Sequence, residues 1–172
     1  FNNGGQPLYW DTQSVWNMGY TFYGASSFDQ PISTGAVTIG DIAFTAWNTS
    51  RVQFLDNAFR GAATFNQDLS SWDTGKVKTL ENIFKNASAF NNGDVAGASS
   101  RPLNWNTPEL SAVNFAFAYA RAFNQQIFAN NASTANVQNM SGMFKGATAF
   151  NQNIGDWNTQ SATDTKRMFE DA

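Results

Sequence analysis

Apolar residues recur along this chain in a fixed order, with polar residues between them. A unit opens on Phe, passes a Trp, and continues through spaced apolar residues to a second Phe. The plainest copy runs from Phe65 to Ala89, and the next copy opens directly after it at Phe90. Units of this length bury their apolar faces by stacking on their neighbours. The sequence therefore predicts a single repeat array over residues 1–172.

The spacing inside the unit separates a rigid part from a variable part. The distance from Trp to the next opening Phe is constant wherever both are present, whereas the distance from the opening Phe to Trp differs from unit to unit. Constant stretches hold packed structure, and stretches of variable length are loops, so the insertions at 31–46 and 93–102 should leave from one edge. We place the six coils at 1–27, 28–64, 65–89, 90–122, 123–149 and 150–172.

The constant part has the rhythm of a short helix. Val137, Met140, Met143 and Phe144 are spaced to share one helical face. An Asp-Thr or Asn-Thr pair precedes this segment in most units as a possible N-cap, and a Gly, Asn or Asp two residues after the second Phe is typical of a helix end. The stretch 69–72 is too short for a helix, so we expect strands there that pair in parallel from coil to coil. The predicted fold class is an α/β solenoid with a short parallel strand and a short helix in each of six coils; a mostly-β solenoid is the alternative.

Residues that recur at one place in every unit are expected to be structural. We predict that the opening phenylalanines and the tryptophans form ladders through the core, and that the Asn or Asp after each opening Phe bonds from coil to coil. The fifth coil lacks its Trp, which we interpret as drift. The ladder residues are Phe1, Phe28, Phe65, Phe90, Phe123 and Phe150, with Trp10, Trp47, Trp72, Trp105 and Trp157.

Composition argues against most kinds of chemistry. The chain has no His and no Cys, so the commonest general base, thiolate metal sites and disulfides are absent. The net charge is −3 with no cluster of Lys or Arg, which does not favour nucleic acid as a partner. No apolar run is long enough to span a membrane. We therefore expect no enzyme activity and no catalytic, cofactor-binding or metal site.

A longer motif resembles a known family. The strings MFKGATAFNQNIGDWNT at 143–159 and AFRGAATFNQDLSSWDT at 58–74 are similar to the repeat of the DUF285 family, the BspA-like leucine-rich-repeat surface proteins. The resemblance implies a leucine-rich-repeat-like solenoid displayed outside the cell, as in surface lipoproteins and adhesins. It implies no catalytic residues.

Two functions fit these patterns. The first is a non-enzymatic extracellular or cell-surface protein with a structural or adhesive role, in which coils stack end to end on other copies as in a filament or surface layer. Because the chain opens and closes on coil boundaries, we expect it to be a window of a longer array or such a stacking unit. The alternative is a module that binds carbohydrate or protein through loops on one edge, with Trp16, Tyr20 and Tyr23 as stacking groups.

Four sequons offer positions for N-linked glycans, although the abundance of Asn, Ser and Thr makes their number unremarkable. Asn131 is the best candidate because it lies in the irregular part of the fifth coil. The others are Asn48, Asn86 and Asn139.

Overall fold

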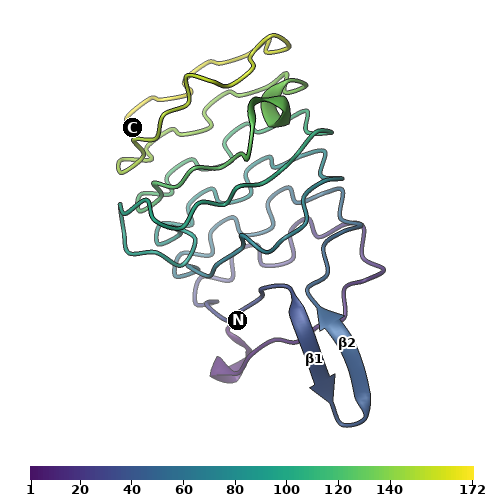
Figure 1. Ribbon diagram of the computed structural model, residues 1–172. Helices are drawn as coiled ribbons and strands as arrows, with labels where there is room; N and C mark the ends of the chain where they lie inside the picture. Colours follow the sequence, from purple (N-terminus) through teal and green to yellow (C-terminus); the bar gives the residue numbers. More distant parts are fainter.

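The protein is an elongated stack of repeats, seen in a computed structural model that describes residues 1–172 (Figure 1). Regular secondary structure is confined to four short elements outside the repeated scaffold. They are the 3-10 helix η1 (Asn3–Gly5), strands β1 (Gly35–Ile39) and β2 (Ile42–Ala46), and the 3-10 helix η2 (Asn131–Thr134). Turns and extended segments make up the rest of the chain.

The predicted fold class is therefore wrong. An α/β solenoid needs a helix and a parallel strand in each coil, but the structure has no α-helix, and its one sheet is the antiparallel pair β1–β2. The mostly-β alternative is wrong for the same reason. Residues 69–72 form no strand. Parallel pairing is limited to isolated bridges. Most of these bridges lie at a different position of the repeat, where Phe54 bridges Thr79 and Thr79 bridges Ala112.

The direction of the backbone N–H groups explains why no helix forms. From Leu80 to Asn86, every second N–H donates to a carbonyl of the next repeat, at 2.8–3.0 Å. The N–H groups of Ile83 and Lys85, between these donors, close tight turns within the repeat, and Lys85 reaches the carbonyl of Asn82 at 3.1 Å. An α-helix needs each N–H to reach the carbonyl four residues back. Because half of these donors bond outward, the segment folds as a run of turns.

Two left-handed residues shape these turns in every repeat. In the third repeat they are Asn82 and Asn86, with φ of 53° and 63°. Each is the third residue of a turn, where a type II turn requires positive φ. The residues expected to end a helix thus have the expected conformation but belong to turns. The six pairs are Tyr20 and Gly24, Asn57 and Gly61, Asn82 and Asn86, Phe115 and Tyr119, Gly142 and Gly146, and Arg167 and Asp171.

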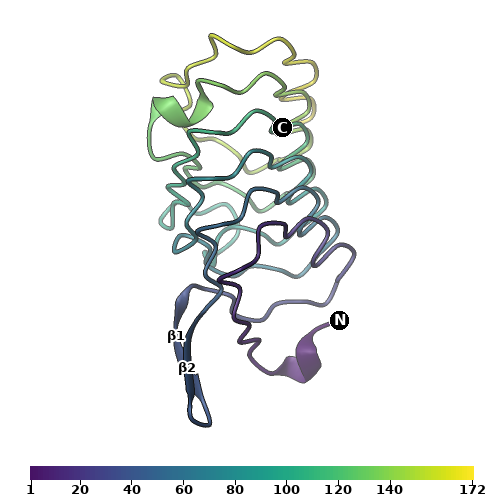
Figure 2. The ribbon, with the colours of Figure 1, turned by 90° about the vertical axis from the view of Figure 1, so that its right-hand side faces the viewer.

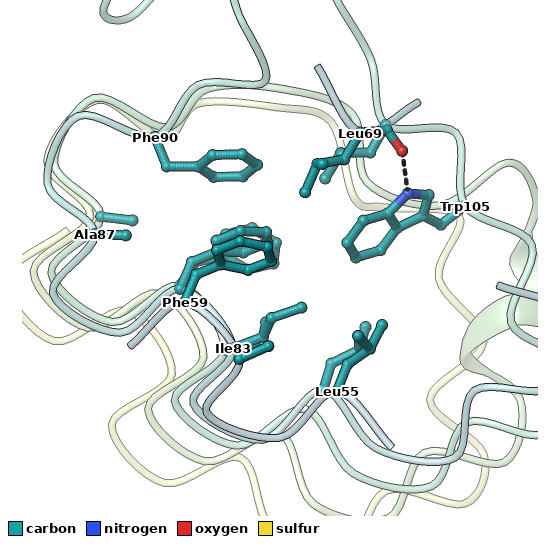
Figure 3. Packing of buried hydrophobic residues seen from close by; sticks show 14 of the residues in the cluster. Leu55, Phe59, Leu69, Ile83, Ala87, Phe90 and Trp105 are labelled. Atoms are coloured by element: carbon teal, nitrogen blue, oxygen red, sulfur yellow. Dashed lines mark hydrogen bonds between the residues drawn. The ribbon is translucent and has the colours of Figure 1, made fainter. Parts of the chain in front are cut away.

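Stacked aromatic rings form the centre of the core (Figure 3). The two phenylalanines that flank each Ala turn lie face to face, with 3.7 Å between the ring centroids of Phe84 and Phe90. Each ring also stacks on its counterpart in the neighbouring repeat, as Phe59 does on Phe84 at 5.4 Å. Such pairs contribute about 0.5–1.5 kcal/mol each beyond the burial of their surface. Two continuous columns of phenylalanine result.

Polar ladders run beside the aromatic columns. After each opening Phe, the side-chain oxygen of Asn or Asp accepts the backbone N–H of its counterpart in the next repeat, at 2.7–3.0 Å. Thr49 and Thr74 are buried and donate their hydroxyls to carbonyls of the next repeat. The Asp or Asn before these threonines caps no helix. Its carboxylate or amide oxygen instead accepts the N–H two residues on, as Asp73 does from Gly75 at 3.0 Å.

The insertion of the second repeat forms a hairpin that leaves the stack. β1 and β2 pair from Gly35 with Ala46 to Ile39 with Ile42. The hairpin projects past the end of the stack that holds the N-terminal repeat (Figure 2). η2, the insertion of the fifth repeat, lies on the same side in this view.

We predict that Phe84→Ala lowers the free energy of unfolding by about 3–5 kcal/mol, because the ring is fully buried between four others. Phe169→Ala is the matched control, since Phe169 belongs to the same column but is 49% exposed. The decrease in the free energy of unfolding should be clearly smaller for Phe169→Ala. Urea unfolding followed by tryptophan fluorescence measures both decreases. Equal losses would contradict the importance of the stacked column.

Replacing Gly146 by Ala should destabilise the protein more than replacing Gly24 by Ala. Both glycines have left-handed φ, of 65° and 68°, which costs about 1–2 kcal/mol for Ala. A Cβ on Gly146 would also lie 2.5 Å from Cδ1 of Tyr119, whereas one on Gly24 would have no atom within 4 Å. In the double variant Tyr119→Ala/Gly146→Ala the additional loss of stability caused by the clash should disappear, as measured by thermal unfolding. If it persists, the clash is excluded as its cause.

Candidate functional site

The aromatic residues proposed as a ligand surface lie on the first repeat. Trp16, Tyr20 and Tyr23 are 56%, 57% and 51% exposed. Trp16 packs edge-on against Phe54, and the rings of Tyr20 and Tyr23 lie 5.5 Å apart. None of the three lines a cavity, and none lies in an inserted loop. The structure therefore does not bring them together with the loops.

The ladder residues are buried inside the stack and become exposed at its two ends. Trp47 stacks on Trp10 at 5.5 Å and on Trp72 at 6.5 Å. Phe1 and Trp10, at one end, are 65% and 45% exposed. At the other end Phe150 and Trp157 are only partly buried. The remaining ladder residues are buried: Phe28, Phe65, Phe90, Phe123, Trp47, Trp72 and Trp105.

The sequons differ in the freedom of their side chains. Asn48 and Asn139 each use the amide oxygen to accept both the N–H and the hydroxyl of the serine two residues on. Asn86 is exposed but has left-handed backbone. Asn131 is exposed in η2. Asn131 therefore remains the best-placed acceptor.

The inner tryptophans share one hydrogen bond that Trp157 lacks. The indole N–H of Trp72 donates to the Ile32 carbonyl of the preceding repeat at 2.9 Å. In the same way, the indole N–H of Trp105 donates to the Leu69 carbonyl at 3.1 Å (Figure 3). The equivalent carbonyl below Trp157 is that of Ile127, which accepts the backbone N–H of Trp105 at 2.8 Å. The indole nitrogen of Trp157 is buried without a partner.

A polar cavity of about 390 Å³ lies beside this tryptophan. One wall comes from η2 and the residues before it, in the fifth repeat. The other comes from the turn at 153–157 in the sixth repeat. Its lining residues are Gln126, Ala129, Asn130, Asn131, Asn153, Asp156 and Trp157.

Our interpretation of the fifth repeat as drift overlooked this cavity. The signal was present in the sequence, as a missing Trp replaced by a run containing Asn130 and Asn131. The cavity itself depends on how η2 and the sixth repeat are placed, which the sequence pattern does not specify.

A second organised loop is the insertion of the fourth repeat. The Asp94 carboxylate accepts the hydroxyl of Ser100 at 2.6 Å and its backbone N–H at 2.9 Å. It also accepts the N–H of Val95 at 2.9 Å and, from the fifth repeat, the amide of Gln125 at 3.3 Å. The bonds from Ser100 favour the charged form and lower the pKa of Asp94 to about 2.

The other shifted pKa values are explained by the immediate surroundings of each group. Lys145 donates to the Glu170 carboxylate at 2.7 Å, which raises the pKa of Lys145 and lowers that of Glu170. Partial burial, followed by the charge of Arg60, lowers the pKa of Lys85.

No group of three or more acidic, His or Cys side chains is arranged to hold a metal ion. None of the helices is long and apolar enough to cross a membrane.

Comparison with known proteins identifies one family. The profile described as Mycoplasma protein of unknown function, DUF285, matches residues 8–97 and 97–172. Searches of curated proteins and of solved structures found no match.

We predict that Asp94 titrates near pH 2, below its ordinary pKa of 3.8. Because the folded-state pKa is lowered, the stabilisation of the loop is complete above the ordinary pKa and is lost as pH falls through about 2. The carboxyl carbon signal of Asp94 in an NMR titration measures this. Ser100→Ala should move the midpoint toward 3.8, and a wild-type midpoint already at 3.8 would contradict the prediction.

Proposed function

Because this chain belongs to the DUF285 family, whose function is unknown, we propose a role from its geometry: a non-enzymatic structural or adhesive protein of the cell surface that stacks end to end. The surface location is favoured by a chain in which only 13% of residues are charged and amide and hydroxyl side chains are abundant. It also fits the resemblance to BspA-like surface proteins.

The support for end-to-end stacking is a complementary pair of backbone rows at the two ends. Inside the stack, four alternate N–H groups of one repeat donate to four alternate carbonyls of the next. In the last repeat the equivalent donors have no backbone partner, and they belong to Thr165, Arg167, Phe169 and Asp171. In the first repeat the equivalent acceptors are also free, and they belong to Asn17, Gly19, Thr21 and Tyr23.

The Asn and Asp ladder is also directional, but in the opposite sense to the backbone row, because each later repeat donates its N–H to the side chain of the earlier one. The amide oxygen of Asn151 accepts no hydrogen bond, and Asn2, at the other end, lacks a preceding ladder residue to receive its N–H. Partly exposed phenylalanines accompany these groups, with Phe169 at 49% and Phe1 at 65% exposure. A further repeat placed on either end, whether from the same protein or from a second copy, would repeat the contacts made inside the chain. Contacts of this head-to-tail kind can continue without closing.

We predict that the protein associates in a concentration-dependent manner, measured by light scattering or native mass spectrometry. Trp10→Glu should block one end and Phe169→Glu the other, because each buries a charge in the aromatic contact. Each variant alone should be monomeric, whereas an equimolar mixture should form a dimer and nothing larger, since one intact end of each kind remains.

Melting temperatures close to the wild-type value serve as the control for folding of both variants. A wild-type protein that stays monomeric at all concentrations, or a mixture that does not pair, would overturn the assembly. Antibody labelling of intact source cells tests the surface location separately.

A further inference from the structure

We propose that the cavity between η2 and the turn at 153–157 binds a neutral carbohydrate. This site goes beyond the structural role proposed above and does not depend on it. Its volume of about 390 Å³ falls within the range of about 300–1,000 Å³ that is usual for small-molecule sites.

The cavity concentrates polar side chains that have no partner within the protein. The side chains of Gln126, Asn131 and Asp156 make no hydrogen bond inside the chain, and all three line the cavity. Asn130 and Asn153 use only their oxygens, to accept the N–H groups of Ser133 and Gly155. Their amide N–H groups remain free to donate.

These groups match the hydrogen bonding of a sugar. A hydroxyl group donates one hydrogen bond and accepts others, so a ring carrying several hydroxyls needs donors and acceptors close together. The amides of Gln126 and Asn131 offer both, and the carboxylate of Asp156 adds two further acceptors. A planar amide or carboxylate can bond two neighbouring hydroxyls at once.

Trp157 supplies the apolar part of the site. Trp157 lines the cavity, and its ring packs near those of Phe128 and Phe144, at 5.2 and 6.1 Å between ring centroids. A large, rigid ring of this kind can pack against the C–H face of a sugar. The indole N–H of Trp157 is buried without a partner, so its signal reports on changes in the surroundings of the ring.

The charge of the lining selects against other ligands. No Lys or Arg lines the cavity, and the Asp156 carboxylate disfavours phosphates, nucleotides and sulfated sugars. A single carboxylate does not make a metal site, and no cluster of metal-binding side chains occurs there. These features favour a neutral ligand rich in hydroxyls.

The lining residue Asn131 is also a sequon, so an attached glycan would lie at the mouth of the same cavity. The test therefore uses protein from a host that adds no N-linked glycans. It uses the Trp10→Glu variant, whose substitution lies in the first repeat and away from the cavity, so that the outcome is independent of end-to-end assembly and a failure here leaves that proposal standing.

The experiment is an NMR titration of the Trp157 indole N–H with neutral sugars: glucose, galactose, mannose, N-acetylglucosamine and their common disaccharides. Glucuronic acid and glucose 6-phosphate are the anionic comparisons. We expect at least one neutral sugar to shift the Trp157 signal in a saturable manner. Gln126→Ala and Asp156→Asn should each weaken this binding at least tenfold.

Gln13→Ala is the matched control, because Gln13 is an exposed glutamine in the first repeat, far along the sequence from the cavity. It should leave the affinity unchanged. The proposal is overturned if no neutral sugar shifts the Trp157 signal in folded protein. It is also overturned if Gln126→Ala binds as well as Gln13→Ala, or if the anionic sugars bind as tightly as the neutral ones.

Discussion

The architecture of this protein depends on how one segment of each repeat divides its backbone N–H groups. Half of them close turns within the repeat and half donate to the repeat that follows. This division prevents a helix, and it requires a left-handed residue at two positions in every repeat. It also fixes the register between repeats, because a shift by one residue would point the outward donors back into their own turns.

The side-chain columns follow from that register. Once equivalent backbone atoms lie above one another, equivalent side chains do too, so phenylalanine meets phenylalanine and each ladder asparagine meets the next. The stack tolerates insertions such as β1–β2 because they leave between the opening Phe and the Trp, outside the hydrogen-bonded turns. Repeat five keeps the turns while losing the Trp, and the cavity arises beside that loss.

The same hydrogen bonding gives the stack a direction. In the repeated turns, the last repeat has the row of unpaired backbone donors and the first has the matching row of acceptors, so the two rows are complementary to each other and not to themselves. In the proposed assembly these rows join like units, while the inserted loops carry the proposed binding groups. The proposed structural role and the proposed carbohydrate site therefore use different parts of the stack.

The sequence alone showed which residues belong to each column of the core. The recurrence of Phe65, Trp72 and Asn66 at fixed places in the unit brings their counterparts together, since a packed repeat must treat like residues alike. The missing Trp of the fifth repeat was equally visible. Yet the sequence could not show the cavity, because its walls come from two repeats whose separation is set by the fold.

The secondary structure, in contrast, was decided by tertiary contacts. Val77, Leu80, Ile83 and Phe84 have spacings that suit a short helix and also suit consecutive turns, and Asn86 is equally at home at a helix end and in a type II turn. The hydrogen-bond partner of each backbone N–H decides between a helix and consecutive turns. For Leu80 that partner is the carbonyl of Ala112 in the next repeat, and no local pattern specifies a contact so distant along the chain.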